Sequence, residues 1–310
     1  MSKLPKVSIV VLTWNGLKLT LDVLKDIGKL KTAGLSAETI VVDNGSKDGT
    51  QEKLCHYKLP NMAFRLIENE KNLGFAEGNN VGMRDAVEKG ADYVLLMNND
   101  VIVPPDFLVQ LIEVAKADKK IGLLAPKMYF AKGYEFHKDR YKRNDLGKVI
   151  WYAGGLIDWD NIYASHRGVD EVDKGQYDRQ EKTVVVNAAC ALIRKKVIKD
   201  IGYLDKKLFA YWEDADYSER ARRAGWRVVY TPKVSLWHKV AQTSGIGSDL
   251  NDYFLTRNRL VFGMRYARLR TKLALIRESF RLILFGRKWQ KIGTVDFYLR
   301  RMGRGSWGKK

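Results

Sequence analysis

Short apolar runs that alternate with helical patterns constrain the fold of this chain more than any other feature. The runs are rich in Val, Ile and Leu, which is typical of strands buried on both faces of a parallel sheet. Between them, residues 17–30 and 76–89 carry apolar side chains at helical spacing, and Gly90 suits a helix C-terminus. This order predicts an α/β sheet with right-handed crossovers. The predicted strands are residues 7–13, 39–43, 64–67 and 93–97.

Polar residues follow three of these predicted strands, at the carboxyl ends where open α/β sheets bind their ligands. Oxygen ligands suit hard cations such as Mg²⁺ and Mn²⁺, so Asp100 is a candidate metal ligand. A triplet such as Asn98-Asn99-Asp100 also fits an ordinary turn, and taken alone it leaves both interpretations open. The three polar segments are Thr13-Trp14-Asn15-Gly16, Asp43-Asn44-Gly45-Ser46 and Asn98-Asn99-Asp100.

The second half of the chain has a less regular pattern. Pro104 and Pro105 suit the start of a helix that runs to about Ala117. Residues 129–182 are polar and aromatic without sustained periodicity, which predicts an insertion or lid. Strands are expected at 184–194 and 228–230, and a helix at 213–224. We therefore expect a catalytic domain over 1–252, with a nucleotide-binding half at 1–104 and an acceptor half at 105–252.

Basic residues concentrate in a C-terminal tail, residues 253–310. The chain has a net charge of +19, and this tail holds 16 Lys plus Arg against Glu278 and Asp296, which leaves about +5 for the rest. Such a tail predicts an anionic partner, either nucleic acid or an anionic membrane surface.

An apolar stripe recurs within the tail at helical spacing. Arginines flank it, as in helices that lie in a membrane interface with their basic side chains reaching the headgroups. An amphipathic helix packed on the domain explains the pattern equally well. The stripe consists of Leu269, Leu273, Ile276, Phe280 and Ile283.

Composition excludes several classes of protein. Two cysteines, Cys55 and Cys190, are too few for a disulfide framework and lie in no metal-binding spacing, which favours a reducing compartment. No run of about 18 apolar residues is present, and the N-terminus lacks the pattern of a signal peptide. We expect a cytoplasmic protein, peripheral at the inner face of the cell membrane.

Six sequence blocks, in order, resemble the family 2 glycosyltransferases, which have the GT-A fold. Their order makes a coincidence improbable, and the third block is similar to the rhamnosyltransferase-like branch. The blocks centre on Trp14-Asn15-Gly16, Asp43-Asn44-Gly45-Ser46, Asn72-Leu73-Gly74-Phe75, Asn98-Asn99-Asp100, Trp212-Glu213-Asp214-Ala215-Asp216 and Trp237-His238.

The resemblance implies the GT-A fold, a mixed and mostly parallel sheet flanked by helices, here followed by the amphipathic tail. It also implies a site for a nucleotide-diphosphate sugar, with Mg²⁺ or Mn²⁺ held by Asp100 and His238. Asn98 stands where many members have a first aspartate, so one metal-binding charge is missing. By the same resemblance, Arg257 contacts a donor or acceptor phosphate, although a surface ion pair explains it equally well. The implied donor contacts are Thr13, Trp14, Asn15, Asp43, Asn72, Gly74, Asn80, Asn98 and Asn99.

Three carboxylates, Glu213, Asp214 and Asp216, crowd the start of a predicted helix. The helix dipole alone explains acidic residues there. Successive helix residues point in different directions, so only one or two of the three can face a common site. By resemblance, Asp214 is the base that activates the acceptor hydroxyl, and Glu213 is a neighbour that orients the acceptor or tunes the base. A single displacement then inverts the anomeric configuration.

The expected reaction is the non-processive transfer of a sugar, with rhamnose as the favoured one. The donor is a dTDP-, UDP- or GDP-linked sugar, and the acceptor is a glycan or a polyprenyl-diphosphate-linked glycan. A homodimer is compatible with the sequence. Two alternatives are a nucleotidyltransferase, for which the expected glycine-rich and lysine-containing loop is missing, and a basic nucleic-acid-binding protein, which would leave the six blocks unexplained.

Overall fold

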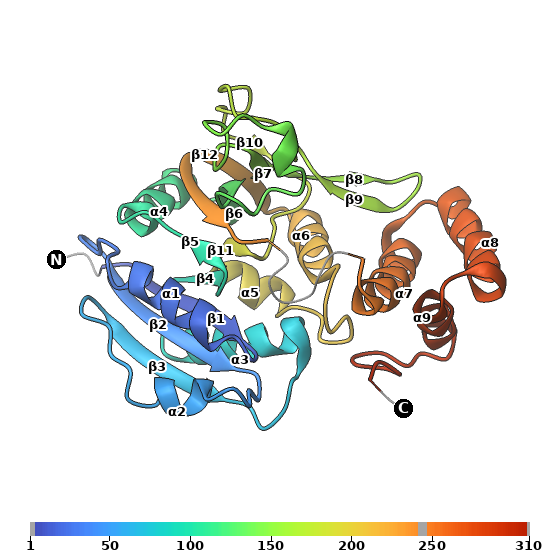
Figure 1. The fold of residues 1–310 in the computed structure, drawn as a ribbon, viewed down its shortest axis with the longest axis horizontal. Coiled ribbons are helices and arrows are strands. Elements are labelled where there is room, and N and C mark those ends of the chain that lie inside the picture. The colour runs from blue at the N-terminus through green and yellow to red at the C-terminus, as the bar shows by residue number, and fades with distance from the viewer. Residues whose placement is uncertain (1–3, 241–246, 309–310) are drawn as a thin grey trace.

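A mixed sheet forms the centre of the computed structural model, which describes residues 4–240 and 247–308. Its strands lie in the order β10-β12-β6-β11-β4-β1-β2-β3 (Figure 1). The strands from β4 to β3 pair in parallel, and β11 is antiparallel to both of its neighbours. The predicted mostly parallel sheet is confirmed. The main strands are β1 (Lys6–Thr13), β2 (Ser36–Asp43), β3 (Ala63–Glu68), β4 (Tyr93–Asn98), β6 (Ile121–Phe130), β11 (Cys190–Arg194) and β12 (Arg227–His238).

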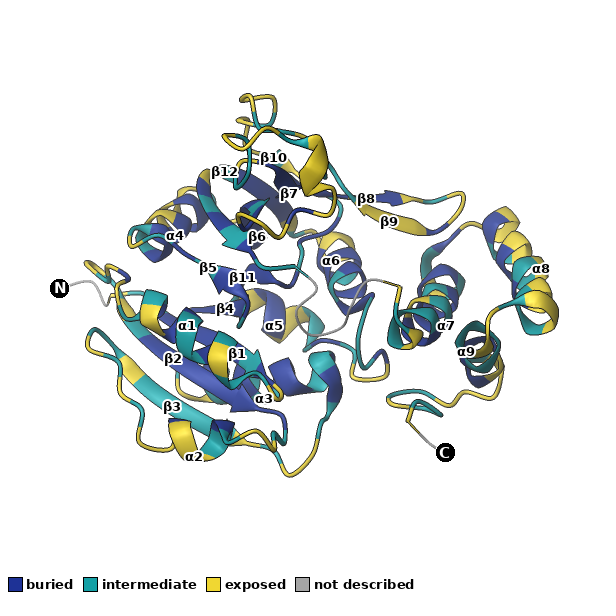
Figure 2. Cartoon of the chain, in the orientation of Figure 1, coloured by how far each residue is buried: buried dark blue, intermediate teal, exposed yellow. Residues whose placement is uncertain are grey.

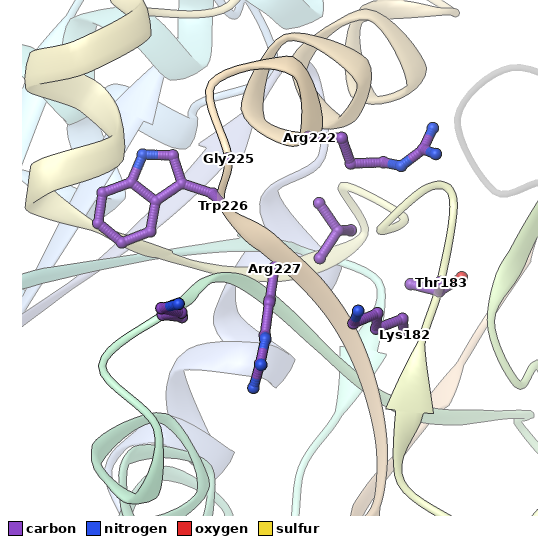
Figure 3. Close-up of a pocket in the computed structure, with 8 residues that line it drawn as sticks. Lys182, Thr183, Arg222, Gly225, Trp226 and Arg227 are labelled. Atoms are coloured by element: carbon purple, nitrogen blue, oxygen red, sulfur yellow. The ribbon is translucent and has the colours of Figure 1, made fainter.

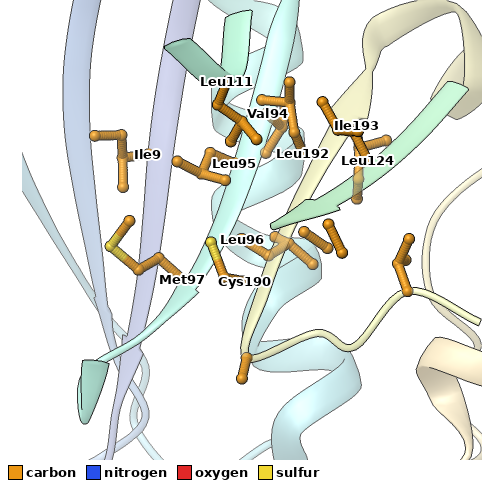
Figure 4. Close-up of a cluster of buried hydrophobic side chains, with 14 of the residues drawn as sticks. Ile9, Val94, Leu95, Leu96, Met97, Leu111, Leu124, Cys190, Leu192 and Ile193 are labelled. Atoms are coloured by element: carbon orange, nitrogen blue, oxygen red, sulfur yellow. The ribbon is translucent and has the colours of Figure 1, made fainter. Parts of the chain in front are cut away.

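Helices cover the sheet and explain why the strands are apolar on both faces. Val10 and Leu95, on neighbouring strands, are fully buried. Figure 4 shows the apolar side chains of β4 and β11 packed together in this core. Burying one such side chain contributes about 1.5–3 kcal/mol. The helices of this part are α1 (Leu17–Ile27), α2 (Thr50–Leu54), α3 (Gly74–Glu88), α4 (Phe107–Ala117), α5 (Lys195–Ile201) and α6 (Glu213–Arg223).

Strand β6 lies at the middle of the sheet, although the sequence pattern did not predict it. Pro126 and Lys127 interrupt its apolar run. Lys127 is nevertheless buried, and its Nζ lies 2.8 Å from Asp173 Oδ2 and 2.5 Å from Asp178 Oδ1. A buried charge is tolerated when it is paired in this way. Since both aspartates belong to the 129–182 region, the pairing also anchors that region to the sheet.

The region expected as an insertion or lid contains short strands of its own. β7 (Ile150–Tyr152) pairs with β6, and β10 (Glu181–Lys182) pairs with β12. β8 (Gly155–Asp158) and β9 (Tyr163–His166) form a hairpin that reaches toward the C-terminal helices (Figure 1).

The C-terminal part folds into three consecutive helices: α7 (Asp249–Tyr266), α8 (Leu269–Phe285) and α9 (Lys288–Tyr298). The domain boundary expected at residue 252 falls inside α7. Figure 2 shows α7 with buried residues toward the catalytic part, whereas α8 lies at the edge of the molecule with many exposed residues. Within residues 4–240 and 247–308, no helix has both the length and the apolar character needed to cross a membrane.

Candidate active site

Asp100 and His238 meet at the carboxyl end of β4, although they are far apart in the sequence. The short strand β5 (Val101–Ile102) follows Asp100 and pairs with the end of β12, so that His238 lies opposite Val101. His238 Nε2 lies 3.0 Å from Asp100 Oδ1, and both side chains are buried. His238 Nδ1 is also buried and has no hydrogen-bond partner. The sheet therefore brings together the two residues that the sequence analysis predicted as metal ligands.

This pair fits a divalent cation that shares its coordination with a substrate. Two neighbouring ligands of an octahedral Mg²⁺, each about 2.1 Å from the ion, lie about 3.0 Å apart. Among the described residues, no group of three or more His, Cys, Asp or Glu is placed to hold an ion. Mg²⁺ is commonly held by one or two protein ligands together with water and phosphate oxygens, which matches a pair rather than a cage.

Asp43 ends β2 with one carboxylate oxygen satisfied and the other without a partner. Its Oδ1 accepts hydrogen bonds from the amides of Gly45 and Ser46 and from Gln51 Nε2, at 2.8–3.0 Å. Its Oδ2 is buried and has no hydrogen-bond partner. A buried acceptor left open is unfavourable unless a ligand donates to it. Asp43 Oδ2 is thus an acceptor that a ligand can satisfy.

The segment after β1 closes over this turn. The Asn15 amide donates to Ser46 Oγ, and Asn15 Oδ1 accepts from the Lys47 amide. Trp14 is exposed beside it. Thr13 Oγ1 accepts a hydrogen bond from Asn99 Nδ2 at 3.3 Å, which links the ends of β1 and β4.

Three other residues that were predicted to contact the nucleotide-sugar donor stabilise loops in the structure. Asn72 Oδ1 accepts from the Gly74 amide and from Asn44 Nδ2. Gly74 has φ +85°, and a Cβ there would lie 2.5 Å from the Phe209 ring. Asn80 is buried, and its amide bonds both the N–H and the carbonyl of Leu204. The expected contact between Asn80 and the nucleotide-sugar donor is therefore corrected, because the side-chain amide of Asn80 is buried and hydrogen-bonded to the protein itself.

The three carboxylates of α6 divide between two roles. Asp216 accepts hydrogen bonds from Arg220, Arg265 and Tyr266, so it fastens α6 to α7. Asp214 is partly exposed, and its Oδ1 accepts from the Ala215 amide at 2.7 Å. Glu213 is 6% exposed, and its Oε2 has no partner. Only Asp214 and Glu213 are therefore available for chemistry.

The surroundings of this pair raise the pKa of both carboxyl groups. Burial raises the pKa of the Asp214 carboxyl, and backbone amides, among them those of Ala215 and Ala188, oppose that rise. Burial, and next the nearby charge of Asp214, raises the pKa of Glu213. A general base works best when its pKa lies closer to the working pH than that of an ordinary carboxylate.

A series of contacts that begins with aromatic rings leads from His238 toward Asp214, and the sequence indicated it only weakly. The Trp151 ring packs edge-on against His238, with the centroids 4.3 Å apart, and also against His166. Asn187 Nδ2 lies 3.1 Å from His166 Nε2, and the next residue, Ala188, bonds Asp214 through its amide. Without a recognisable motif, only the fold reveals this arrangement.

Arg257 lies outside this site. Its side chain is fully buried, and its guanidinium donates to backbone carbonyls, including those of Leu208 and Gly303. Both alternatives given for Arg257, a phosphate contact and a surface ion pair, are therefore wrong, because burial and protein acceptors occupy the side chain.

Two hollows lie elsewhere on the surface. One, of about 360 Å³, is lined by basic residues that include Lys182, Arg222 and Arg227 (Figure 3). Arg227 begins β12 and His238 ends it, so this hollow lies at the opposite end of the strand from Asp100 and His238. The other, of about 620 Å³, lies against Asp92 at the amino end of β4. Neither coincides with the candidate site.

The sequence profile of the family described as "Glycosyltransferase like family 2" matches residues 5–263. An N-acetylglucosaminyl-diphospho-decaprenol L-rhamnosyltransferase of Mycobacterium tuberculosis is 26% identical over 219 residues, which cover 66% of this chain and 67% of that protein. A poly-beta-1,6-N-acetyl-D-glucosamine synthase of Staphylococcus aureus is 27% identical over 215 residues, 67% of this chain and 44% of that protein.

Solved structures share the fold at low sequence identity. A crystal structure of GalNAc-T7 with UDP, GalNAc and Mn²⁺ matches with a TM-score of 0.62 and 16% identity, over 96% of this chain and 57% of that one. The mannosyltransferase PcManGT from Pyrobaculum calidifontis, in complex with GDP-Man and Mn²⁺, matches with a TM-score of 0.56 and 15% identity, over 100% and 89%. With the profile match covering most of its length, the chain belongs to the family 2 glycosyltransferases, has the GT-A fold and is similar to their rhamnosyltransferase-like branch.

Proposed function

We propose that the protein is an inverting, metal-dependent glycosyltransferase that moves one sugar from a nucleoside-diphosphate donor to a hydroxyl of a glycan or lipid-linked glycan. The observation that carries this proposal is the buried contact between Asp100 and His238 at the carboxyl end of β4. This edge of the sheet also holds Asp43 with its open acceptor oxygen. A nucleoside diphosphate can therefore place its base at Asp43 and its phosphates toward Asp100.

Asp100 and His238 would hold Mg²⁺ or Mn²⁺. Bound there, the ion acts as a Lewis acid that neutralises the diphosphate leaving group. His238 would hold the ion through Nε2, the nitrogen that faces Asp100, with its ring in the neutral form. Asn98 supplies an amide where an aspartate would add charge, so we expect weaker metal binding than a second carboxylate would give.

Asp214 is proposed as the base. It takes the proton of the acceptor hydroxyl while that oxygen forms a bond to the anomeric carbon and the bond from this carbon to the donor phosphate breaks. The attack comes from the side opposite the leaving group, so the configuration inverts and no covalent intermediate forms. Glu213, buried next to Asp214, is proposed to hold its proton and to keep this side of the site apolar.

The favoured donor is a dTDP-linked sugar, with rhamnose as the sugar and a polyprenyl-diphosphate-linked glycan as the acceptor. The similarity to a rhamnosyltransferase whose name specifies a diphospho-decaprenol acceptor supports this choice. Structural neighbours hold UDP and GDP-Man, so the scaffold also accommodates other bases.

Nucleotide binding tests the metal site without depending on the acceptor. We expect calorimetry to show that dTDP, UDP or GDP binds tightly only when Mn²⁺ is present. Asp100→Asn should weaken this binding about 10- to 100-fold. The matched control is Asp106→Asn, because Asp106 is exposed and paired with Lys31 away from the site. An Asp100→Asn protein with unchanged metal-dependent binding would remove Asp100 from the metal site.

The orientation of α8 supports one of the two interpretations of the apolar stripe. The face of α8 that packs on the protein carries Thr271, Leu275 and Ser279. The stripe lies on another side, and Leu269, Leu273 and Phe280 are 73%, 60% and 57% exposed. This exposure supports the membrane-interface interpretation for Leu269, Leu273 and Phe280, although the Phe280 ring also stacks against Tyr298 of α9.

Charge favours an anionic bilayer as the partner of this stripe. Arg270, Arg277 and Arg281 are exposed beside it, and none of them forms an ion pair with any residue in 4–240 or 247–308. A second copy of this protein would bring the same positive charge to the contact, whereas anionic headgroups attract it. We propose that α8 lies in the interface at the cytoplasmic face of the cell membrane and so keeps a peripheral enzyme near lipid-linked acceptors.

Vesicle sedimentation tests this proposal. The full chain should bind vesicles that contain phosphatidylglycerol and not vesicles of phosphatidylcholine alone. The double variant Leu273→Ser, Phe280→Ser should lose this binding and keep metal-dependent nucleotide binding. Leu255→Ser is the matched control, because Leu255 is also exposed, 42%, but lies on α7. Retained vesicle binding by the double variant, preferential binding to DNA, or a stripe-dependent homodimer in solution would contradict it.

A further inference from the structure

The segment just before the proposed base has an unusual backbone conformation. Phe209, Tyr211 and Trp212 have φ values of +65°, +66° and +72°, although none of them is glycine. Residues with side chains adopt this left-handed region only when their surroundings hold them there. Trp212 is the N-cap of α6, and Asp214 is the second residue of that helix. The position of Asp214 therefore depends on what holds residues 207–212, which we call the base loop.

Asn258 of α7 binds the base loop through one side-chain amide group. Its Nδ2 donates to the carbonyl oxygens of Leu208, Ala210 and Tyr211, at 2.8, 2.8 and 2.9 Å. The Asn258 side chain is fully buried, so water does not compete for these bonds. Three carbonyls of a strained loop thus converge on a single residue of the C-terminal helices.

Arg257 links the base loop to the C-terminal segment. Its Nη2 donates to the carbonyls of Lys207 and Leu208, and its Nη1 donates to those of Arg301 and Gly303, at 2.7–3.3 Å. Among the described residues, no carboxylate forms an ion pair with this guanidinium. A buried charge without a counter-ion is unfavourable unless hydrogen bonds satisfy it. The backbone carbonyls around Arg257 supply these hydrogen bonds, so their arrangement is specific.

An opposite support comes from α3. The Ala76 amide donates to the Phe209 carbonyl at 3.1 Å, and the Phe209 ring packs where Gly74 has no side chain. The Phe209 ring also stacks against the ring of Phe254 on α7, with the two centroids 5.1 Å apart. The base loop is therefore clamped between the nucleotide-binding half and α7.

We propose that Asn258 and Arg257 are positioning residues that hold the base loop so that α6 begins at Glu213 and presents Asp214 to the acceptor. The proposal rests on the proposed function only for the role of Asp214. It gives α7 and residues 301–303 a role in positioning the base loop, in addition to connecting α8 to the rest of the protein.

Kinetics of Asn258→Ala test this proposal directly. We expect kcat to fall about 100-fold, because a displacement of about 1 Å can have that effect, while KM for the donor and metal-dependent nucleotide binding stay within about twofold. The matched control is Arg259→Ala. Arg259 lies next to Asn258, but its guanidinium donates to Asn161, Ile162 and Glu278. This control should keep kcat within about threefold.

Trypsin reports on the base loop without any assay of activity. Lys206 and Lys207 are exposed at its start. Asn258→Ala should be cleaved there at least about tenfold faster than the wild type, and Arg259→Ala should not. If Asn258→Ala does not fold, Asn258→Ser, which keeps one donor, and Arg257→Lys are the milder variants, and each should lower kcat at an unchanged KM.

Separate outcomes overturn the two proposals. Wild-type kcat and wild-type cleavage in folded Asn258 variants would refute the positioning role, as would equal effects of Asn258→Ala and Arg259→Ala. A melting temperature that falls without a change in kcat would show a merely structural role. Faster cleavage together with full turnover by Asp214→Asn would instead mean that the loop is held as described but that Asp214 is not the base.

Discussion

Glu213 offers a test of the electrostatics of the site, because its carboxyl is buried and one of its oxygens has no partner. Burial and the neighbouring Asp214 raise its pKa above the ordinary value of 4.5. The folded protein therefore keeps a proton that the unfolded chain releases near pH 4.5. Glu213→Gln removes the titrating group and keeps its size.

The sign of the effect follows from proton linkage. Between the pKa of the unfolded chain and the raised pKa of the folded protein, the folded state binds one more proton, so stability falls as pH rises. The loss reaches at most about 1.4 kcal/mol per pH unit. Below pH 4.5 the two states bind the proton equally and the loss disappears. Glutamine does not titrate, so the Glu213→Gln variant should not show this loss of stability as pH rises.

Denaturant unfolding of wild type and Glu213→Gln at pH 5.0 and 7.5 measures this difference. We expect the free energy of unfolding of the variant, relative to wild type, to increase by at least about 1.4 kcal/mol from pH 5.0 to 7.5. The corresponding change in melting temperature is roughly 3 °C. Asp216→Asn provides the contrast, because it removes an acceptor of three hydrogen bonds and should destabilise by about 3 kcal/mol at pH 7.5. Parallel stability curves for wild type and Glu213→Gln would refute the raised pKa.

Two further predictions concern packing that supports the site. Gly74→Ala should destabilise by about 2 kcal/mol or more in denaturant unfolding, because its Cβ would meet the Phe209 ring at 2.5 Å. Gly90→Ala should cost only about 1 kcal/mol, since Gly90 shares a positive φ but has open space around it. Lys127→Met should lose about 3 kcal/mol, measured in the same way, because the partly buried Asp173 carboxylate is left without its cation. Equal losses for the two glycine variants, or a stable Lys127→Met protein, would contradict these assignments.

Much of the sheet was predictable, because the strands buried on both faces carry unbroken apolar runs. Strand β6 was missed because Lys127 interrupts its run, and the ion pairs that make a buried lysine acceptable come from residues 46 and 51 positions away. The tail was expected as one amphipathic unit. Its division into α7, α8 and α9 depends on packing between helices, which periodicity alone does not report.

The site was predictable to the extent that short motifs lie at strand ends. Asp43, Asp100 and His238 lie at one edge of the sheet, as open α/β sheets require. Asn80 and Arg257 show the limit of such reasoning, because a motif specifies a residue type and a place in the chain, whereas burial decides what the side chain contacts. No role was predicted for Asn258 from the sequence, and only its three carbonyl partners reveal one.

The most direct test of the proposed mechanism compares Asp214→Asn with wild type in two measurements on the same preparation. Turnover with a nucleotide-sugar donor should fall about 10²- to 10⁴-fold, the contribution of a well-placed general base. Mn²⁺-dependent binding of the nucleoside diphosphate should stay within about twofold, because Asp43, Asp100 and His238 remain in place. Turnover that stays near the wild-type rate in Asp214→Asn would contradict the assignment of Asp214 as the base.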